Sequence, residues 1–236
     1  MSIFHFKKFS ISHERSGIKV GTDAVLLGAV APAEGVRRAL DVGTGCGVMA
    51  LMLLQRGVRE VVAVEIDFDA AQEAKENARN SPWNAQMEVV CCDFCDKKRL
   101  LELGTFDLIV SNPPFFSHSL SSPDPKRTRA RHNDALPFPI LLERAERLLT
   151  EKGIFCVILP HSESSNFIAL AQMNRLYLSE RHEIHPKPNT SPIREILFLQ
   201  RNAITPLKRH TLTIYNSENN YSAEFIALTK DFYLNL

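Results

Sequence analysis

The sequence predicts an α/β fold, in which a mostly parallel sheet of seven strands carries helices on both faces and an antiparallel hairpin at one edge. Two observations lead to this prediction. Over residues 38–175, short apolar runs alternate with longer segments of helical spacing, which is typical of strand–helix–strand units. Two strand-like runs, 176–184 and 193–201, then follow each other without a long helix between them, as in a hairpin.

Each predicted strand is a short run rich in Val, Ile, Leu or Phe, bounded by polar or glycine-containing segments. The expected strands, in chain order, are Arg38–Val42, Glu60–Glu65, Met87–Cys92, Phe106–Val110, Ile154–Leu159, Leu176–Ile184 and Ile193–Arg201. In a parallel sheet covered by helices, ligands bind beyond the carboxyl ends of the strands. The residues that directly follow these strands are therefore the first candidates for a functional site.

The segments between the strands combine helix-favouring Ala, Leu, Glu and Lys with apolar residues at helical spacing. The expected helices are Val48–Arg56, Phe68–Asn80, Lys97–Leu103, Pro139–Leu149 and Ser164–Arg175. Gly57, Ser81-Pro82 and Gly153 follow three of them at or near their ends, where glycine and proline stop a helix.

Two segments lie outside this alternation. Residues 1–31 have a strand-like start and then an apolar helix over 24–30, for which Thr22 or Asp23 is the expected N-cap. Residues 117–137 are expected to form a long irregular segment after the fourth predicted strand. Loops of this length inside a domain are usually functional.

Composition limits the broad class of protein. The chain has 236 residues, of which 44% are hydrophobic and 23% charged, which fits one globular domain over 1–236 with a sizeable core. We expect a cytoplasmic protein, because no apolar run could span a bilayer and the N-terminus lacks the apolar core of a signal peptide. An odd count of five cysteines argues against a disulfide framework. The net charge of +1 gives no support for a nucleic-acid partner, so that case depends on local segments.

A glycine-rich turn follows the first predicted strand, in the order Asp41-Val42-Gly43-Thr44-Gly45-Cys46-Gly47. Alternate glycines allow a sharp turn and the close approach of a ligand. Taken alone the turn is weakly specific, because a tight turn without a ligand uses the same residues. Its G-x-G-x-G spacing differs from the G-x-G-x-x-G of nicotinamide and flavin sites.

Two acids stand at the ends of the next strands. Glu65 ends the second strand, where a carboxylate can bind both hydroxyls of a ribose. Asp93 follows the third strand and can accept from an adenine amino group. The alternative is a pair of solvated acids at strand ends.

A rigid polar arc, Ser111-Asn112-Pro113-Pro114-Phe115, directly follows the fourth predicted strand. Two adjacent prolines cannot continue a helix or pair inside a sheet, so they hold the backbone extended beyond the strand end. The Asn112 amide oxygen and the Pro113 carbonyl can each accept one N–H of a planar amine, while the Phe115 ring stacks on its face. The alternative is a proline-rich loop that merely ends the strand.

Together these features resemble the Rossmann-like class I methyltransferases that use S-adenosylmethionine and release S-adenosylhomocysteine. In amino-methyltransferases of this class, [DNS]-P-P-[FYW] after the fourth strand is the catalytic signature, and residues 112–115 match it at every place. The resemblance implies catalytic roles for Asn112, Pro113, Pro114 and Phe115, and it places segment 1–31 over the cofactor site. It implies cofactor contacts from Thr22, Asp23, Asp41, Gly43, Thr44, Gly45, Gly47, Glu65, Ile66, Asp93, Phe94 and Asn112.

The two ends of the chain narrow the resemblance further. The upstream segment 17–27, the Ala130-Arg131-His132 triplet and the C-terminal runs 221–225 and 228–234 are similar to the bacterial family that methylates N6 of adenine 37 in a valine tRNA. Members of that family often carry Tyr at the place of Phe115, a change that keeps the stacking face and leaves adenine versus another amine open.

A basic segment beyond the catalytic motif favours an RNA partner. The candidates for binding tRNA phosphates are Lys126, Arg127, Arg129, Arg131 and His132. The alternative is a solvated surface loop, since runs of charge are usually solvated.

Neither the lone C-x-x-C of Cys92 and Cys95 nor the scattered histidines have the spacing of a metal site, so we expect no metal. The sequence leaves the oligomeric state open, with a monomer as the working expectation.

Three other functions stay open at this level. The first is an N-methyltransferase with another acceptor, a protein glutamine or an rRNA guanine. The second is an RNA-binding protein whose methyltransferase fold is inactive, which the intact Asn112 and Glu65 disfavour. A nicotinamide oxidoreductase is the third, and the G-x-G-x-x-G turn that it needs is absent from the first strand–helix turn.

Overall fold

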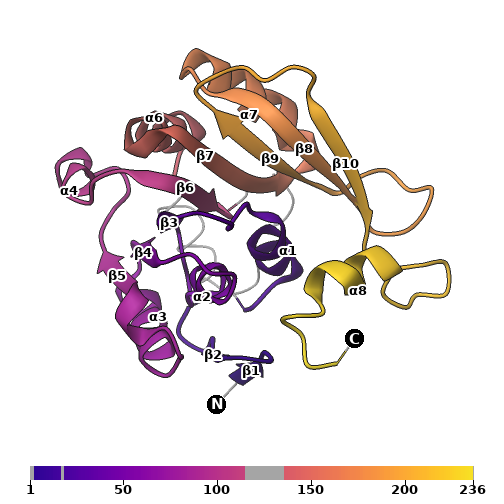
Figure 1. Cartoon of the computed structure of the whole chain (residues 1–236), viewed down its shortest axis with the longest axis horizontal. Helices are drawn as coiled ribbons and strands as arrows, with labels where there is room; N and C mark the ends of the chain where they lie inside the picture. The colour runs from indigo at the N-terminus through magenta and orange to yellow at the C-terminus, as the bar shows by residue number, and fades with distance from the viewer. Residues whose placement is uncertain (1–2, 17–18, 115–135, 236) are drawn as a thin grey trace, which may run out of the picture.

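The computed structural model describes residues 3–16, 19–114 and 136–235, and its centre is an eight-stranded sheet with the strand order β10-β8-β9-β7-β6-β3-β4-β5 (Figure 1). These strands are β3 (Arg38–Val42), β4 (Glu60–Glu65), β5 (Met87–Cys91), β6 (Phe106–Ser111), β7 (Leu149–Pro160), β8 (Tyr177–His185), β9 (Arg194–Gln200) and β10 (Lys208–Thr213). In this sheet β9 runs antiparallel to β7 and β8, and every other neighbouring pair is parallel. The predicted α/β class is confirmed, with β8 and β9 as the predicted hairpin.

Helices cover both faces of the sheet (Figure 1). They are α1 (Thr22–Val30), α2 (Val48–Gln55), α3 (Phe68–Arg79), α4 (Lys97–Leu101), α6 (Phe138–Leu148), α7 (His161–Met173) and α8 (Ala223–Thr229), with a 3-10 turn at Asn84–Gln86. Alternate residues of one strand serve opposite faces, because successive side chains of a strand point to opposite sides. In β6, Leu108 and Val110 join the core under α1, α2 and α3, whereas Ile109 joins the core under α4, α6 and α7.

The predicted element boundaries differ from the observed ones at two places with a clear cause. Strand β7 begins at Leu149 and not at Ile154, because Leu149 already pairs with Phe106 of β6. The expected N-cap of α1 was wrong. Gly21 is the N-cap and no side chain caps it, because the helix begins at Thr22 and so contains both expected residues. The carboxylate of Asp23 accepts from Arg194 of β9.

The N-terminal end forms the predicted strand-like start as a small hairpin, and the C-terminal end forms structure that the sequence pattern did not indicate. The small hairpin of β1 (Ile3–His5) and β2 (Ser10–Ser12) lies beside the C-terminal segment, and Phe6 forms a bridge with Tyr233. Strand β10 adds an eighth strand by pairing with β8, and Ser222 caps helix α8 through Phe225 N–H. No helix in the described part of the chain is both long and apolar enough to cross a membrane.

Candidate functional site

The carboxyl ends of β3, β4, β5 and β6 lie side by side at one edge of the sheet, and hydrogen bonds connect the loops that follow them. Gly45 N–H after β3 donates to Glu65 Oε2 at 2.8 Å, and Cys92 N–H after β5 donates to the Glu65 carbonyl at 2.9 Å. Ser111 Oγ at the end of β6 donates to the Val42 carbonyl of β3 at 3.0 Å. The structure therefore gathers the glycine turn, Glu65 and the start of the Asn-Pro-Pro motif at one edge.

The glycine turn needs glycine for two different reasons. Gly43 and Gly45 have φ of 72° and 55°, a left-handed conformation that costs other residues free energy. A Cβ atom added at either would meet nothing within 4 Å, whereas one at Gly47 would lie 3.0 Å from Met87 Cε. The first two glycines thus leave open space for a ligand beside the backbone, and Gly47, whose φ is also positive at 86°, lets the start of α2 lie close to β5 and α3.

Asp41 is fully buried beneath this turn. Its Oδ2 accepts from Thr44 Oγ1 at 2.6 Å and from Ala50 N–H at 3.2 Å, while its Oδ1 has no partner. Burial raises the pKa of Asp41 to about 7, against the opposing effect of the bonds from Thr44 and Ala50. The orphaned oxygen leaves unused acceptor capacity directly under the turn.

Glu65 is held by the backbone on both of its oxygens. Its Oε1 accepts from Ile66 N–H at 2.9 Å and Asp67 N–H at 3.0 Å, and its Oε2 accepts from Gly45 N–H. Burial raises the pKa of Glu65, opposed by the bonds from Asp67, Gly45 and Ile66. A carboxylate offers about four acceptor positions, so at least one further donor, such as a hydroxyl, can bind while these three bonds persist.

The residues expected near an adenine are divided between surface and core. Asp93 is exposed and accepts from Cys95 N–H at 2.7 Å, and Ile66 is 42% exposed beside Glu65. The Phe94 ring is buried in the core under α4, α6 and α7. Contact between Phe94 and a ligand therefore has to come from its backbone or the small exposed part of its ring.

The Asn-Pro-Pro arc leaves the sheet directly after β6. Asn112 is half-buried, Pro113 is buried and Pro114 is exposed, and the arc begins beside β3, because Ser111 pairs with Val42 directly before the glycine turn. Phe115 lies outside the described residues. The same holds for the predicted RNA contacts Lys126, Arg127, Arg129, Arg131 and His132, and for residues 117–135 of the predicted substrate loop.

The start of α1 reaches the same edge of the sheet. Thr22 is exposed, and Asp23 Oδ2 accepts from Arg194 Nε at 2.8 Å. Arg194 opens β9 opposite Pro160, the last residue of β7. This ion pair ties the segment before β3 to the far half of the sheet. Arg194 lies on β9, whereas Lys208 and Arg209 lie on the outer strand β10.

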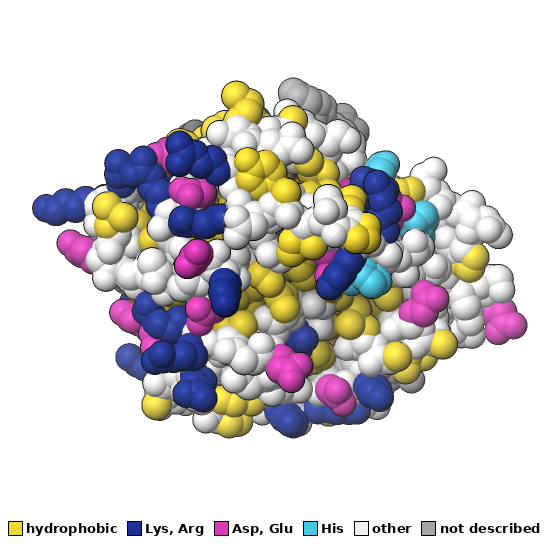
Figure 2. Space-filling model, turned by 45° about the horizontal axis from the view of Figure 1, so that its top comes forward, with side chains coloured by type: hydrophobic (Ala, Val, Ile, Leu, Met, Phe, Trp, Pro, Cys, Tyr) yellow, Lys and Arg dark blue, Asp and Glu magenta, His cyan; other side chains and the backbone are white. Residues whose placement is uncertain are grey.

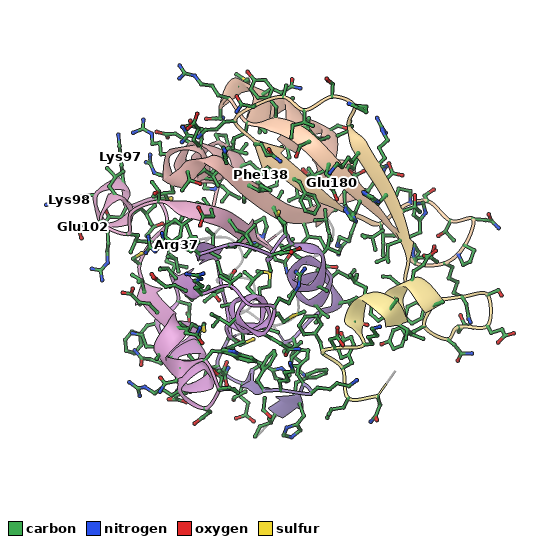
Figure 3. The ribbon with its side chains drawn as sticks, in the orientation of Figure 1. Arg37, Lys97, Lys98, Glu102, Phe138 and Glu180 are labelled. Carbon is green, nitrogen blue, oxygen red and sulfur yellow. The ribbon has the colours of Figure 1, made fainter. Side chains whose placement is uncertain are left out.

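On the face shown in Figure 2, the charges of the described residues do not form a continuous basic patch. In the view of Figure 2, Lys and Arg side chains are interspersed with Asp and Glu, in line with the net charge of +1. Lys97 and Lys98 belong to α4 at the left edge of Figure 3, away from Glu180 near the middle of the view. Surface charge over the described residues therefore does not by itself locate a nucleic acid.

In the described part of the chain, one group of side chains comes close enough together to hold a metal ion: the ligand atoms of Glu180, His182 and His210 lie within 4.8 Å of one another. Figure 3 labels Glu180, which lies on β8. His182 Nε2 lies 2.7 Å from Glu180 Oε1, and the two imidazole rings stack with centroids 4.4 Å apart and planes at 29°. Each nitrogen lone pair lies in its ring plane, so the lone pairs of stacked rings do not converge on one ion. Lys208 Nζ, 3.9 Å from Glu180 Oε2, also repels a cation. Hydrogen bonding and stacking between β8 and β10 explain this cluster.

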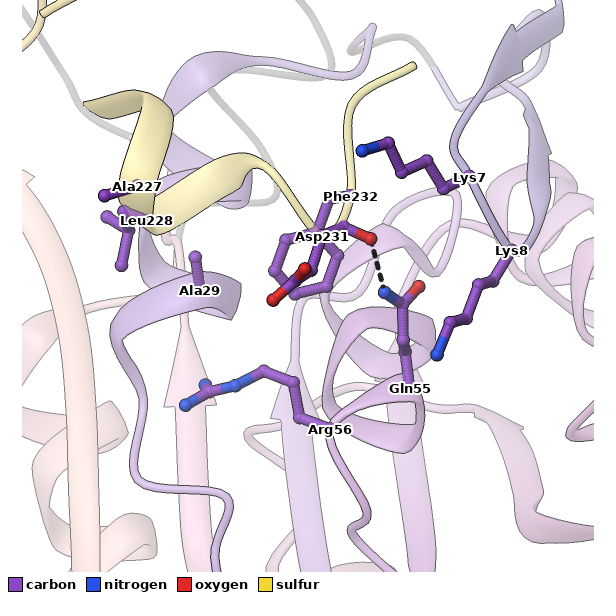
Figure 4. A pocket seen from close by; sticks show the side chains of 9 residues that line it. All are labelled: Lys7, Lys8, Ala29, Gln55, Arg56, Ala227, Leu228, Asp231 and Phe232. Atoms are coloured by element: carbon purple, nitrogen blue, oxygen red, sulfur yellow. Dashed lines mark hydrogen bonds between the residues drawn. The ribbon is translucent and has the colours of Figure 1, made fainter. Parts of the chain in front are cut away.

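A pocket of about 520 Å³ lies elsewhere, between the β1–β2 turn, the end of α2 and α8 (Figure 4). It is separated from the glycine turn by the eight residues of α2, a length of about 12 Å. Two of its cationic side chains donate to backbone carbonyls: Lys7 donates to that of Lys230, and Arg56 donates to those of Gly28 and Ala31. We interpret this pocket as a structural junction between the chain ends and α2.

Sequence reasoning missed two buried polar residues of α3, Glu73 and Asn77. They stand four residues apart and share their buried side of the helix with Ala70, Ala74 and Ala78. The signal available in the sequence was a Glu and an Asn at helical spacing among alanines, on the side that faces the core.

Comparison with known proteins assigns the family. The profile of the methyltransferase small domain matches residues 13–177. A Bacteroides fragilis protein named tRNA1(Val) (adenine(37)-N6)-methyltransferase is 43% identical to this chain, and the match covers 99% of this chain and 98% of that protein. The relative of the same name from Tolumonas auensis is 40% identical over 99% of this chain and 97% of the relative. That from Yersinia enterocolitica is 41% identical over 98% of this chain and 92% of the relative.

Solved structures confirm the fold. A predicted O-methyltransferase from Agrobacterium tumefaciens superimposes with a TM-score of 0.67 at 20% identity, over 89% of this chain and 96% of that one. A T. thermophilus 16S rRNA N2 G1207 methyltransferase, solved with AdoMet and guanosine, gives 0.58 at 21% identity over 86% of this chain and 52% of that one. With the full-length relatives, these likenesses lead to one assignment: the chain belongs to the methyltransferase small domain family and, within it, to the family of the tRNA1(Val) (adenine(37)-N6)-methyltransferases.

Proposed function

We propose that this chain transfers a methyl group from S-adenosylmethionine to the exocyclic N6 amine of adenine 37 in a valine tRNA. The observation that carries the proposal is the Asn112-Pro113-Pro114 arc directly behind β6, next to the glycine turn of β3. The names and nearly full coverage of the relatives support the choice of tRNA and of adenine.

The residues at the carboxyl edge fit S-adenosylmethionine, which supplies an electrophilic methyl group on a sulfonium when bound. Gly43 and Gly45 have open space where a side chain would stand, so a ligand can lie against the backbone there. Glu65 keeps spare acceptor capacity for a ribose hydroxyl, and Asp93 is exposed where it can accept from an amino group. Asp41 supports the turn from below and carries an unpartnered oxygen.

The acceptor half of the site works by positioning and electrostatics. The lone pair of an adenine N6 amine is delocalised into the ring, so the free amine is a poor nucleophile. In our proposal Asn112 Oδ1 and the Pro113 carbonyl each accept one N–H, which draws electron density onto nitrogen and aims its lone pair for in-line attack. Phe115 stacks on the base, which has to be unstacked to enter. The nitrogen becomes acidic once methylated, so its proton can pass to water without a strong base.

Further parts of the proposal concern partners. We assign phosphate binding to the basic segment that holds Lys126, Arg127, Arg129, Arg131 and His132, because it follows the catalytic motif closely in the sequence. A tRNA substrate places the enzyme in the cytoplasm, and the proposed mechanism needs one copy of the chain and no metal.

Mass spectrometry of tRNA nucleosides, after incubation of the enzyme with tRNA and methyl-labelled cofactor, tests the proposal. We expect labelled N6-methyladenosine, and its absence when adenine 37 of the valine tRNA is replaced. Label on guanine N2 of rRNA or on a release-factor glutamine, with none on tRNA, would contradict the proposal. The basic segment is tested separately: charge reversal at Arg129 and Arg131 should weaken tRNA binding and reduce its salt dependence.

A further inference from the structure

A fully buried carboxylate on α3 binds the N-terminal segment of the chain. Glu73 has no exposed surface, yet its oxygens accept from Ser12 Oγ at 3.0 Å, Glu14 N–H at 2.8 Å, Arg15 N–H at 3.1 Å and Ser16 N–H at 2.9 Å. Three consecutive backbone N–H groups therefore converge on one side chain.

This arrangement makes the path of residues 12–16 depend on Glu73. Backbone N–H groups that lose their partner away from water cost free energy, and Ser16 is itself buried. Burial alone would raise the pKa of Glu73, but the bonds from Arg15, Ser16, Glu14 and Ser12 outweigh it and the pKa is lowered. The carboxylate is thus charged at neutral pH, as an acceptor of several N–H groups has to be.

One helical turn further on, Asn77 connects the same segment to the glycine turn. Its Nδ2 donates to the Ser12 carbonyl at 2.8 Å and to the Cys46 carbonyl at 2.9 Å, and its Oδ1 accepts from Ser12 N–H at 2.9 Å. Cys46 lies between Gly45 and Gly47 of the turn. One face of α3 therefore fixes the N-terminal segment and the glycine turn relative to each other.

We propose that Glu73 and Asn77 are positioning residues for the cofactor: they hold residues 12–16 and the glycine turn in the arrangement that binds S-adenosylmethionine, without touching it. The proposal rests on the proposed function only for the identity of the cofactor, and it does not depend on the methyl acceptor. It assigns a role to a helix face that no predicted site residue occupies.

The test compares Glu73→Ala, Glu73→Gln and Asn77→Ala with a matched control, Glu76→Ala. Glu76 lies on the same helix and pairs with the Arg15 side chain, but it is exposed and accepts no backbone N–H from residues 12–16. The dissociation constant for S-adenosylhomocysteine is measured by calorimetry on each folded variant, with the melting temperature recorded beside it. KM for tRNA and kcat at saturating cofactor are measured in parallel.

We expect Glu73→Ala and Asn77→Ala to raise the dissociation constant by about tenfold or more, as lost preorganisation does. Glu73→Gln, which keeps one carbonyl acceptor, should recover part of that loss, and the control should stay within about twofold of the wild type. KM for tRNA and kcat at saturating cofactor should change little in every variant, because the acceptor site is untouched.

The positioning role is overturned if folded Glu73→Ala and Asn77→Ala bind S-adenosylhomocysteine as the wild type does, or if they lose only thermal stability. It is also overturned if the control loses as much affinity as they do. Should Glu73→Ala fail to fold, Asn77→Ala and Glu73→Gln decide the matter alone. A wild-type protein that does not bind S-adenosylhomocysteine would instead refute the proposed cofactor, so the two failures are distinguishable.

Discussion

The buried carboxylate of Asp41 predicts a specific pH dependence of folding stability. Burial raises its pKa from the ordinary 3.8 to about 7, so between these values the folded protein keeps a proton that the unfolded chain has released. The folded state is then favoured at low pH, and this contribution is lost as the pH rises toward 7. A shift of about three pKa units corresponds to about 4 kcal/mol for a group that is fully buried.

Asp41→Asn removes this titration while keeping a carbonyl oxygen for Thr44 and Ala50. Its absolute stability also reflects the buried NH2 group that takes the place of Oδ1, so the informative quantity is the difference between variant and wild type. We expect the difference in the free energy of unfolding, variant minus wild type, to rise by about 2.5 kcal/mol from about pH 5 to about pH 8. Other titrating groups are common to both proteins and cancel.

Urea unfolding at a series of pH values measures this difference. Thr44→Val serves as a second variant, because it removes a hydrogen bond that lowers the pKa of Asp41. Loss of the bond should move the titration to higher pH. Curves for wild type and Asp41→Asn that stay parallel from pH 5 to pH 8 would refute the reasoning, since they would mean that Asp41 has the same pKa folded and unfolded.

Three further predictions concern the proposed site. Asn112→Ala should keep its affinity for S-adenosylhomocysteine and lower kcat by about 10²-fold or more, because it removes a bond to the reacting amine; unchanged turnover would exclude Asn112 from catalysis. Glu65→Gln should weaken binding of S-adenosylhomocysteine by about tenfold or more in calorimetry, because its NH2 group would face the backbone donors of Gly45 or Ile66. An unaltered dissociation constant would argue against a ribose contact. A double-mutant cycle of Asp23→Ala and Arg194→Ala, measured by urea unfolding, should give a coupling free energy of about 0.5–1 kcal/mol, because the ion pair is partly exposed. A coupling free energy near zero would contradict a role for the pair in fixing α1.

Local pattern was sufficient for most of the fold. Strands β3 and β4 agree with their predicted bounds because each is an apolar run ended by charged residues or glycine. Strand β10 could not be found in this way. Its sequence, Lys208–Thr213, is largely exposed and polar, and it becomes a strand only because β8 offers it an edge to pair with. Its existence is decided by tertiary contact and not by hydrophobic spacing.

The same distinction applies to the site. Glycines at alternate positions, an acid at the end of β4 and two prolines after β6 are each read from neighbouring residues in the chain, and a parallel sheet brings strand ends to one edge. For this reason the fold class, the edge proposed to carry the site and the family resemblance could all be predicted from the amino-acid sequence, and the full-length relatives confirm the family.

The way in which those residues are held depends on how the folded chain packs. Glu73 and Asn77 form hydrogen bonds with residues more than fifty positions away in the sequence. The ion pair of Asp23 and Arg194 joins residues that are 171 positions apart. The Phe94 ring is buried although its motif predicts a ligand contact. Burial and long-range hydrogen bonds depend on which elements pack together, and no local spacing encodes the partner of a buried polar group.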